Sequence, residues 1–296
     1  MEVATPIGRK RELLKYRADR LNFWRALTGP LILLLPAFTG LPEGWPALPY
    51  GVAVWFALCD LNYVLHQHVH LPMSHSRTVN RLLDFSLSCV TGMSAYNWRQ
   101  HHIIRHHACD DGWRQTTERE FKNYSFLGSI TYSLKAALVM FAFPLWEAMV
   151  KGLFKNQKQP INFRAAFFEQ LTVSAIMFGL IFHLPAFYGP YFFMVYFFTG
   201  MADYDNHVGC GETAYGFANN TTHRCYNWVR NNFGYHTAHH CYPEAHWTRL
   251  PELHAKIAGN IPPARIGRSR WVGLYSPPIL FYLFVKKEDG VSVEIA

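Results

Sequence analysis

The stretch HQHVH, residues 66–70, places two histidines four positions apart directly after an apolar run of the chain. Residues i and i+4 of an α-helix lie on one face, so His66 and His70 can direct two imidazoles at the same metal ion. The pattern recurs in HHIIRHH (101–107) and HTAHH (236–240). These first, second and third histidine stretches hold ten of the 16 histidines. They predict three helical segments that bind metal.

Nine histidines are candidate metal ligands because of their spacing near the ends of apolar runs. One of them, His207, lies one helical turn after Asp203 in the stretch DYDNH. Asp203 is the candidate catalytic carboxylate, which would hold a ligand or a metal-bound water; the alternative is a polar residue that only ends a helix. Nine imidazoles are too many for one ion, so we expect two metal ions, and ligand type alone leaves iron, copper, zinc and nickel open. The nine candidates are His66, His70, His102, His106, His107, His207, His236, His239 and His240.

The remaining histidines are predicted to bind no metal. His68 and His101 are out of phase with their neighbours on a helix. Five more are isolated along the chain, which is typical of surface or core histidines: His75, His183, His223, His246 and His254.

Four apolar runs are long enough to cross a bilayer, whose hydrocarbon core needs about 20 helical residues. LPEGWPA joins Phe23–Gly40 to Leu48–Leu65, and HLPAFYGP joins Ala165–Leu184 to Tyr188–Asp203. Proline and glycine break helices and favour tight turns, so each pair is predicted to form a transmembrane hairpin. The predicted fold class is all-α integral membrane, with about four transmembrane helices in two hairpins and a cytosolic, histidine-rich helical cap.

A fifth apolar run, Ile130–Met149, is interrupted by Lys135, Pro144 and Glu147. If all histidine stretches share one aqueous side, the chain between the second and third must cross the membrane an even number of times. This parity favours a helix on the membrane surface over the alternative of five spans. We expect a single domain, 1–296, divided into a cytosolic lead (1–22), hairpin 1 (23–65), the first two histidine stretches (66–125), an interfacial helix region (126–160), hairpin 2 (165–203) and a cytosolic cap with the third stretch (204–296).

The formal net charge is +8, and half of the residues are hydrophobic. Basic residues concentrate before the first apolar run, whereas neither hairpin turn contains Lys or Arg. Both termini should therefore be cytosolic. The basic residues would meet anionic headgroups or an acidic protein, and we expect no nucleic-acid partner. The six cysteines form no CxxC pair, so they favour neither a disulfide framework nor a thiolate metal site.

These motifs resemble the three histidine boxes of the membrane fatty acid desaturase and alkane hydroxylase superfamily. HQHVH, HIIRHH and HTAHH match the boxes, and HHCYPEAHWTRLPELH, from His239 to His254, is similar to the proline-containing tail of the family. The resemblance covers most of the chain. It implies a centre of two iron ions on the cytosolic face, held by the nine candidate histidines, with O2 as co-substrate.

The resemblance also implies an oxidoreductase that attacks an unactivated C–H bond of a fatty acid or fatty-acyl chain. We expect desaturation, with hydroxylation and oxidative decarboxylation to a terminal alkene as alternatives. Three residues separate His102 from His106, as in the alkane hydroxylases, and Gln67 replaces a usual acidic residue. Asp203 stands where the family has an asparagine. These departures bear on the desaturase activity more than on the di-iron centre.

Reducing equivalents should come from an external ferredoxin-like or cytochrome-like donor with its reductase, because the chain has no four-cysteine rubredoxin-like pattern. A basic cytosolic surface would suit an acidic donor. Arginines that could hold an acidic headgroup are Arg99, Arg105 and Arg224, with solvent-facing or lipid-facing side chains as the alternative. Further carboxylates close to the candidate ligands in sequence are Asp60, Asp110 and Asp205.

Two rival hypotheses belong to other classes of protein. A metal transporter would place histidines in the middle of its spans, whereas here nearly all lie just outside the apolar runs and only His183 lies at the end of one. A zinc-binding scaffold would need fewer ligands and no route for a long apolar substrate.

Overall fold

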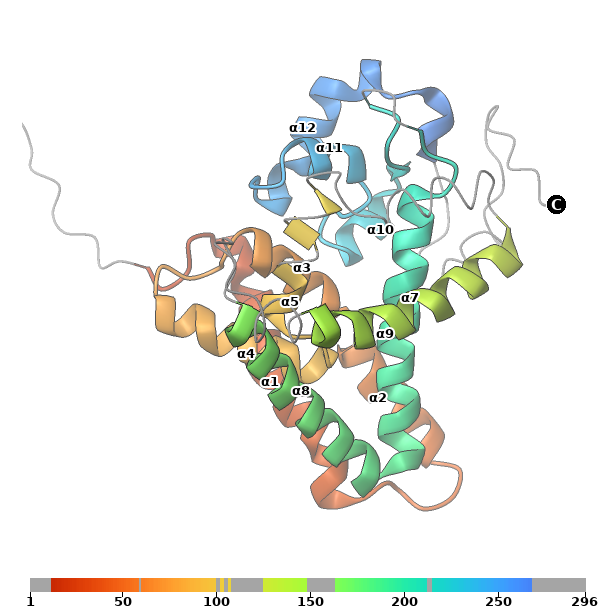
Figure 1. Cartoon of the computed structure of the whole chain (residues 1–296). Coiled ribbons are helices and arrows are strands. Elements are labelled where there is room, and N and C mark those ends of the chain that lie inside the picture. The colour runs from red at the N-terminus through yellow and green to blue at the C-terminus, as the bar shows by residue number, and fades with distance from the viewer. Residues whose placement is uncertain are drawn as a thin grey trace, which may run out of the picture.

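The chain is mostly helical, and the computed structural model describes residues 12–58, 60–99, 102–103, 106–107, 125–147, 163–211 and 215–267. The helices of the bundle are α1 (Arg20–Thr39), α2 (Ala47–Leu58), α3 (Leu61–His70), α4 (Arg77–Thr91), α5 (Ala95–Arg99), α7 (Phe126–Glu147), α8 (Phe163–His183) and α9 (Pro185–His207). The cap contains α10 (Arg224–Val229), α11 (His236–Cys241) and α12 (Leu250–Ile257), with strands β1 (Asn220–Thr221) and β2 (Ile266–Gly267). Figure 1 shows this cap above the long helices. The predictions for His101, Arg105, Asp110 and segments 108–124, 148–162 and 268–296 lie outside the described residues.

Two helices of the described part are long and apolar enough to cross a membrane, Arg17–Thr39 and Arg164–His183. They coincide with the first and third apolar runs, and 20 helical residues rise about 30 Å. α1 also exposes a stripe of large apolar side chains: Leu21, Trp24, Leu31, Leu35 and Phe38. Such a stripe suits contact with lipid. The total of four spans stays a prediction.

The second apolar run, Leu48–Leu65, is divided between α2 and α3. Asp60 lies at the division and is buried, and its Oδ2 accepts a hydrogen bond from Arg25 Nη1 of α1 at 2.7 Å. The Asp60 carbonyl accepts the N–H of Tyr63 at 2.9 Å, which begins α3. A buried carboxylate needs a cationic partner because its desolvation is costly. The ion pair therefore fixes the start of the helix that carries the first histidine stretch.

α4 is a helix that the apolar runs do not predict. Ser76 caps its start by accepting the Val79 N–H at 3.4 Å, and Gly92 ends it at a left-handed φ of 72°. The Ser86 hydroxyl donates to the Ala26 carbonyl, so α4 lies beside the first half of α1. In this position α4 connects the first histidine stretch to the second.

α7 lies across α9, as Figure 1 shows. Gly200 permits the crossing, because a Cβ at this position would lie 3.0 Å from Ala136 Cβ and 3.1 Å from Ser133 Cα. The close approach brings the buried Tyr132 of α7 to Asp203 of α9, whose carboxylate accepts a hydrogen bond from the Tyr132 hydroxyl. A helix that crosses the bundle in this way is consistent with the interfacial region predicted at 126–160, which stays a prediction.

The N-terminal lead is attached to the cap. Buried Asp19 accepts hydrogen bonds from Trp247 Nε1 at 2.8 Å and from His246 Nε2 at 3.1 Å. The His246 ring also stacks on Tyr16, with centroids 4.0 Å apart. The segment that follows the third histidine stretch is thus held against residues from the start of the chain.

Candidate metal centre

Two groups of histidines lie between the bundle and the cap, and all nine candidate ligands fall into them. The five-histidine group consists of His66, His70, His102, His107 and His239, and the four-histidine group of His106, His207, His236 and His240. Within each group the ligand nitrogens lie within 4.8 Å of one another. The groups are adjacent, since the rings of His107 and His240 stack with centroids 4.4 Å apart.

The first histidine stretch is arranged as its spacing predicts. His66 and His70 project from one face of α3 into the five-histidine group, with ring centroids 5.1 Å apart. His66 Nε2 lies 2.9 Å from Nε2 of His239 in α11. Helices from distant parts of the sequence therefore meet at this group.

The second stretch divides its histidines between the groups, and the α-helical spacing assumed for it is wrong. The i, i+4 spacing predicts that His102 and His106 direct their rings at one metal ion. The two rings do stack, with centroids 5.0 Å apart, but His102 shares its group with His107 and His106 belongs to the other group. The reason is a π-helical turn, in which the His107 N–H donates to the carbonyl of His102, five residues earlier, at 3.0 Å. Residues five apart then share a face, and Nε2 of His102 lies 3.0 Å from Nε2 of His107.

The third stretch supplies both groups from one helix. His236 and His240 of α11 belong to the four-histidine group and His239 to the five-histidine group. Thr237, between them, holds α11 in the cap by donating its N–H to Asn220 Oδ1 at 2.9 Å. The position of α11 therefore determines the geometry of both groups.

Gly234→Ala is expected to displace this helix. An added Cβ would lie 2.4 Å from the Thr221 carbonyl oxygen and 2.7 Å from Asn227 Oδ1, and overpacking of this kind costs about 1–3 kcal/mol. We expect a lower midpoint of thermal unfolding and a lower metal content by elemental analysis. In Gly259→Ala the added Cβ meets no atom within 4 Å, so this control should match the wild type. The same unfolding midpoint in both variants would contradict the prediction.

His207, at the end of α9, is fully buried with a fixed ring orientation. Its Nδ1–H donates to the Phe217 carbonyl at 3.0 Å, because a carbonyl only accepts. Nε2 then carries the lone pair of the neutral ring and lies 3.3 Å from His236 Nε2. A hydrogen bond to the far ring nitrogen is typical of metal-binding histidine.

Burial keeps five of the grouped imidazoles neutral. Desolvation, followed by repulsion from neighbouring histidines, places the pKa values of His66, His102 and His239 well below the ordinary value. The same causes lower the pKa values of His70 and His240. Neutral imidazole is the form that binds metal. Nε2 of His70 is buried with no hydrogen-bond partner in the described part of the chain, and a metal ion would satisfy it.

A cavity on the side of α7 and α9 contacts both groups. It is lined by His66 and His102 of the five-histidine group and by His106 and His236 of the four-histidine group. Its other walls include Tyr63, Trp98, Thr199, Asp203 and Phe233. A molecule in this cavity would therefore lie next to both candidate metal positions.

A second hollow reaches the five-histidine group from the cap. His66, His70 and His239 line it, together with Asp19 and Trp247 from the contact between the N-terminal lead and the cap. The five-histidine group is thus approached from two sides.

Two aromatic residues that contact the groups are not predicted from the sequence. Trp98 stacks on His102 with an interplanar angle of 3° and centroids 5.5 Å apart. Phe233 lies edge-on to His66 and His236, at 5.0 Å and 4.8 Å. Trp98 precedes His102 by four residues, so the helical spacing applied to the histidines could also have identified it.

The other candidates have different surroundings. Among the isolated histidines, the His183 ring lies 2.9 Å from the Ala37 carbonyl and His223 caps α10. Arg99 binds Asp84 at 3.0 Å, whereas Arg224 is exposed. Asp60 pairs with Arg25, as described above. These groups lie outside both histidine groups.

Comparison with known proteins identifies the family of the chain. The family model described as fatty acid desaturase matches residues 43–271, which include every residue of both histidine groups. No curated protein and no solved structure matches the chain.

Proposed function

We propose that this chain, which belongs to the fatty acid desaturase family, is a di-iron enzyme that uses O2 to desaturate a fatty acid or fatty-acyl chain. Membership of the family makes the chain an oxidoreductase associated with membranes. The observation that supports the finer statement is the pair of adjacent histidine groups beside one cavity. Each group would hold one iron ion, since imidazole is a suitable ligand for iron.

The residues of the chain would orient a substrate beside the metals. When bound, the two iron ions would supply the activation of O2 and the removal of hydrogen from a C–H bond. Trp98 and Phe233 line the cavity next to the histidines, where their rings exclude water and leave apolar surface for methylene groups. The cavity would thus place one section of a carbon chain against both metal positions.

Asp203 is proposed as the catalytic carboxylate. It lines the cavity and lies one helical turn before His207, and the Tyr132 hydroxyl fixes its orientation. Asp203→Ala is expected to lower product formation by roughly 10–100-fold, as loss of an outer partner of a metal site typically does. Asp203→Asn should retain more activity, because an amide oxygen still accepts the Tyr132 hydrogen bond.

These variants are compared by product yield per bound iron, with Tyr132→Phe as the variant that keeps the carboxylate and removes its donor. Wild-type yield from Asp203→Ala would exclude a catalytic role.

Hydroxylation is the second candidate reaction. The spacing of three residues between His102 and His106 favours it. The π-helical turn at this spacing assigns the two histidines to different groups. Decarboxylation to a terminal alkene is a third outcome of the same first step. All three begin with hydrogen removal, so only the product distinguishes them.

The proposed enzyme has four spans, with both termini, the metal centre and the cap on the cytosolic side. The lipid-suited stripe of α1 supports the first span. The enzyme would take electrons from a ferredoxin-like or cytochrome-like donor and its reductase. The hollow between the N-terminal lead and the cap would give the five-histidine group access to the solvent from which such a donor approaches.

The test is mass spectrometry of lipids, free acids and volatile hydrocarbons from iron-replete cells that express the wild type or His239→Ala. A new double bond in wild-type cells alone would support desaturation, whereas a hydroxyl group or a lost carboxyl group would assign one of the alternatives. Zinc without iron in the purified protein, with no new product, would overturn the proposal.

A further inference from the structure

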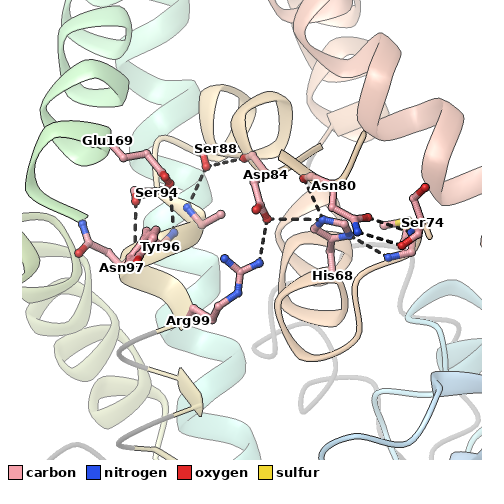
Figure 2. Close-up of polar contacts among 12 residues, drawn as sticks. His68, Ser74, Asn80, Asp84, Ser88, Ser94, Tyr96, Asn97, Arg99 and Glu169 are labelled. Atoms are coloured by element: carbon pink, nitrogen blue, oxygen red, sulfur yellow. Dashed lines mark hydrogen bonds and ion pairs between the residues drawn. The ribbon is translucent and has the colours of Figure 1, made fainter. Parts of the chain in front are cut away.

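His68 is the one histidine of the first stretch that belongs to neither group. It is fully buried, and Figure 2 shows its ring among residues of α4 and the turn after α3. The Met73 N–H donates to His68 Nδ1 at 3.3 Å, so the ring proton is on Nε2. Nε2 donates to the Asn80 carbonyl at 3.3 Å and lies 3.5 Å from Asp84 Oδ1.

Asp84 connects this ring to the second histidine stretch. Its Oδ1 also accepts a hydrogen bond from Arg99 Nη2 at 3.0 Å, as Figure 2 shows. Arg99 ends α5 three residues before His102, and the adjacent Trp98 stacks on the His102 ring. The side chains of Asp84 and Arg99 are only 18% and 30% exposed, so water screens this ion pair less than one on the surface.

Both ends of this connection are fixed to other elements. The Asn80 side chain exchanges two hydrogen bonds of 2.9 Å with the main chain of Ser74, which holds the turn after α3. At the other end, the Ser94 hydroxyl donates to Glu169 of α8 at 2.8 Å, beside the start of α5. α4 therefore acts as a spacer between two anchored segments.

We propose that the contact chain His68–Asp84–Arg99 positions the first and second histidine stretches relative to each other and so assembles the five-histidine group. The inference rests on the proposed metal centre. Four ligands of the five-histidine group come from these two stretches, whereas the four-histidine group takes only His106 from them and the rest from α9 and α11. The three members are positioning residues, because none belongs to either group.

This asymmetry predicts a selective effect. Asp84→Leu removes both contacts of the carboxylate while keeping a side chain of similar size. We expect iron bound at the five-histidine group to lose roughly 10–100-fold in affinity, as for other outer partners of metal sites, and iron at the four-histidine group to remain. A variant that simply misfolds would lose both.

The experiment is iron content and Mössbauer spectroscopy of 57Fe-loaded protein, with His70→Ala and His207→Ala as references for the loss of each site. Asp84→Leu should lose the spectral component that His70→Ala loses and retain the component that His207→Ala loses. Asp84→Asn keeps an acceptor oxygen and should restore part of the missing iron. Tyr188→Phe, which removes a buried hydrogen bond of 2.7 Å to the Leu33 carbonyl, is the control and should keep both components.

Equal loss of both components in Asp84→Leu, or retention of both, would overturn the inference. If the wild type binds zinc alone, the proposed iron chemistry fails. The zinc content of the same variants then decides the positioning role separately. A wild type that binds no metal would overturn both proposals.

Discussion

Replacing His70 or His207 with alanine is expected to lower product formation by more than about 100-fold, which exceeds the typical effect of an outer partner of a metal site. Each residue belongs to a different histidine group, and the cavity contacts both groups. If O2 activation requires both iron ions, loss of either site stops the reaction although the other ion stays bound.

The measurement is product yield together with iron per chain for both variants. His75→Ala is the matched control, because this histidine is exposed and belongs to neither group. Its activity and iron content should equal those of the wild type. Substantial product from either His70→Ala or His207→Ala would mean that a single metal suffices, which is contrary to the di-iron proposal.

Removal of the metal is expected to lower the midpoint of thermal unfolding by roughly 10 °C. A ligand present at 1,000 times its Kd stabilises the folded state by about 4 kcal/mol, and each kcal/mol corresponds to about 2–4 °C for a chain of this order of size. The metals would join α3, α9, α11 and the second histidine stretch, which all contribute ligands. Without metal these elements keep only their packing and hydrogen bonds.

The experiment compares purified protein before chelation, after chelation and after return of Fe²⁺. Recovery of the midpoint on return of iron separates metal linkage from irreversible damage. If the chelated protein has lost its iron but unfolds at the same midpoint as before chelation, the histidine groups are stabilised without metal.

The first and third histidine stretches were predictable because they lie on α-helices, α3 and α11, where spacing alone defines a shared face. The prediction of nine ligand candidates depended on this rule and on position near apolar runs. The grouping of His102 with His107 was not predictable in this way, because the π-helical turn changes which residues lie on the same face. A helix of that kind leaves little trace in the pattern of residue types.

The helices of the bundle were predictable where apolar runs were long and uninterrupted. α1 and α8 fulfil this condition. Asp60 interrupts the second run, and its effect depends on Arg25, a partner 35 residues away. α4 is short and carries polar residues that face Arg99 and His68, so hydropathy alone could not place it in the bundle. In both cases, the break at Asp60 and the position of α4, the structure depends on contacts with residues that are distant in the sequence.

The positions of the ligands along the chain determine when synthesis supplies each of them. The five-histidine group already has four members by residue 107, but its fifth, His239, and three members of the four-histidine group come after residue 200. The ribosome has therefore produced α1 to α9 before either group can be complete. Completion of either metal site is consequently a late event in synthesis, because both groups need histidines of α11.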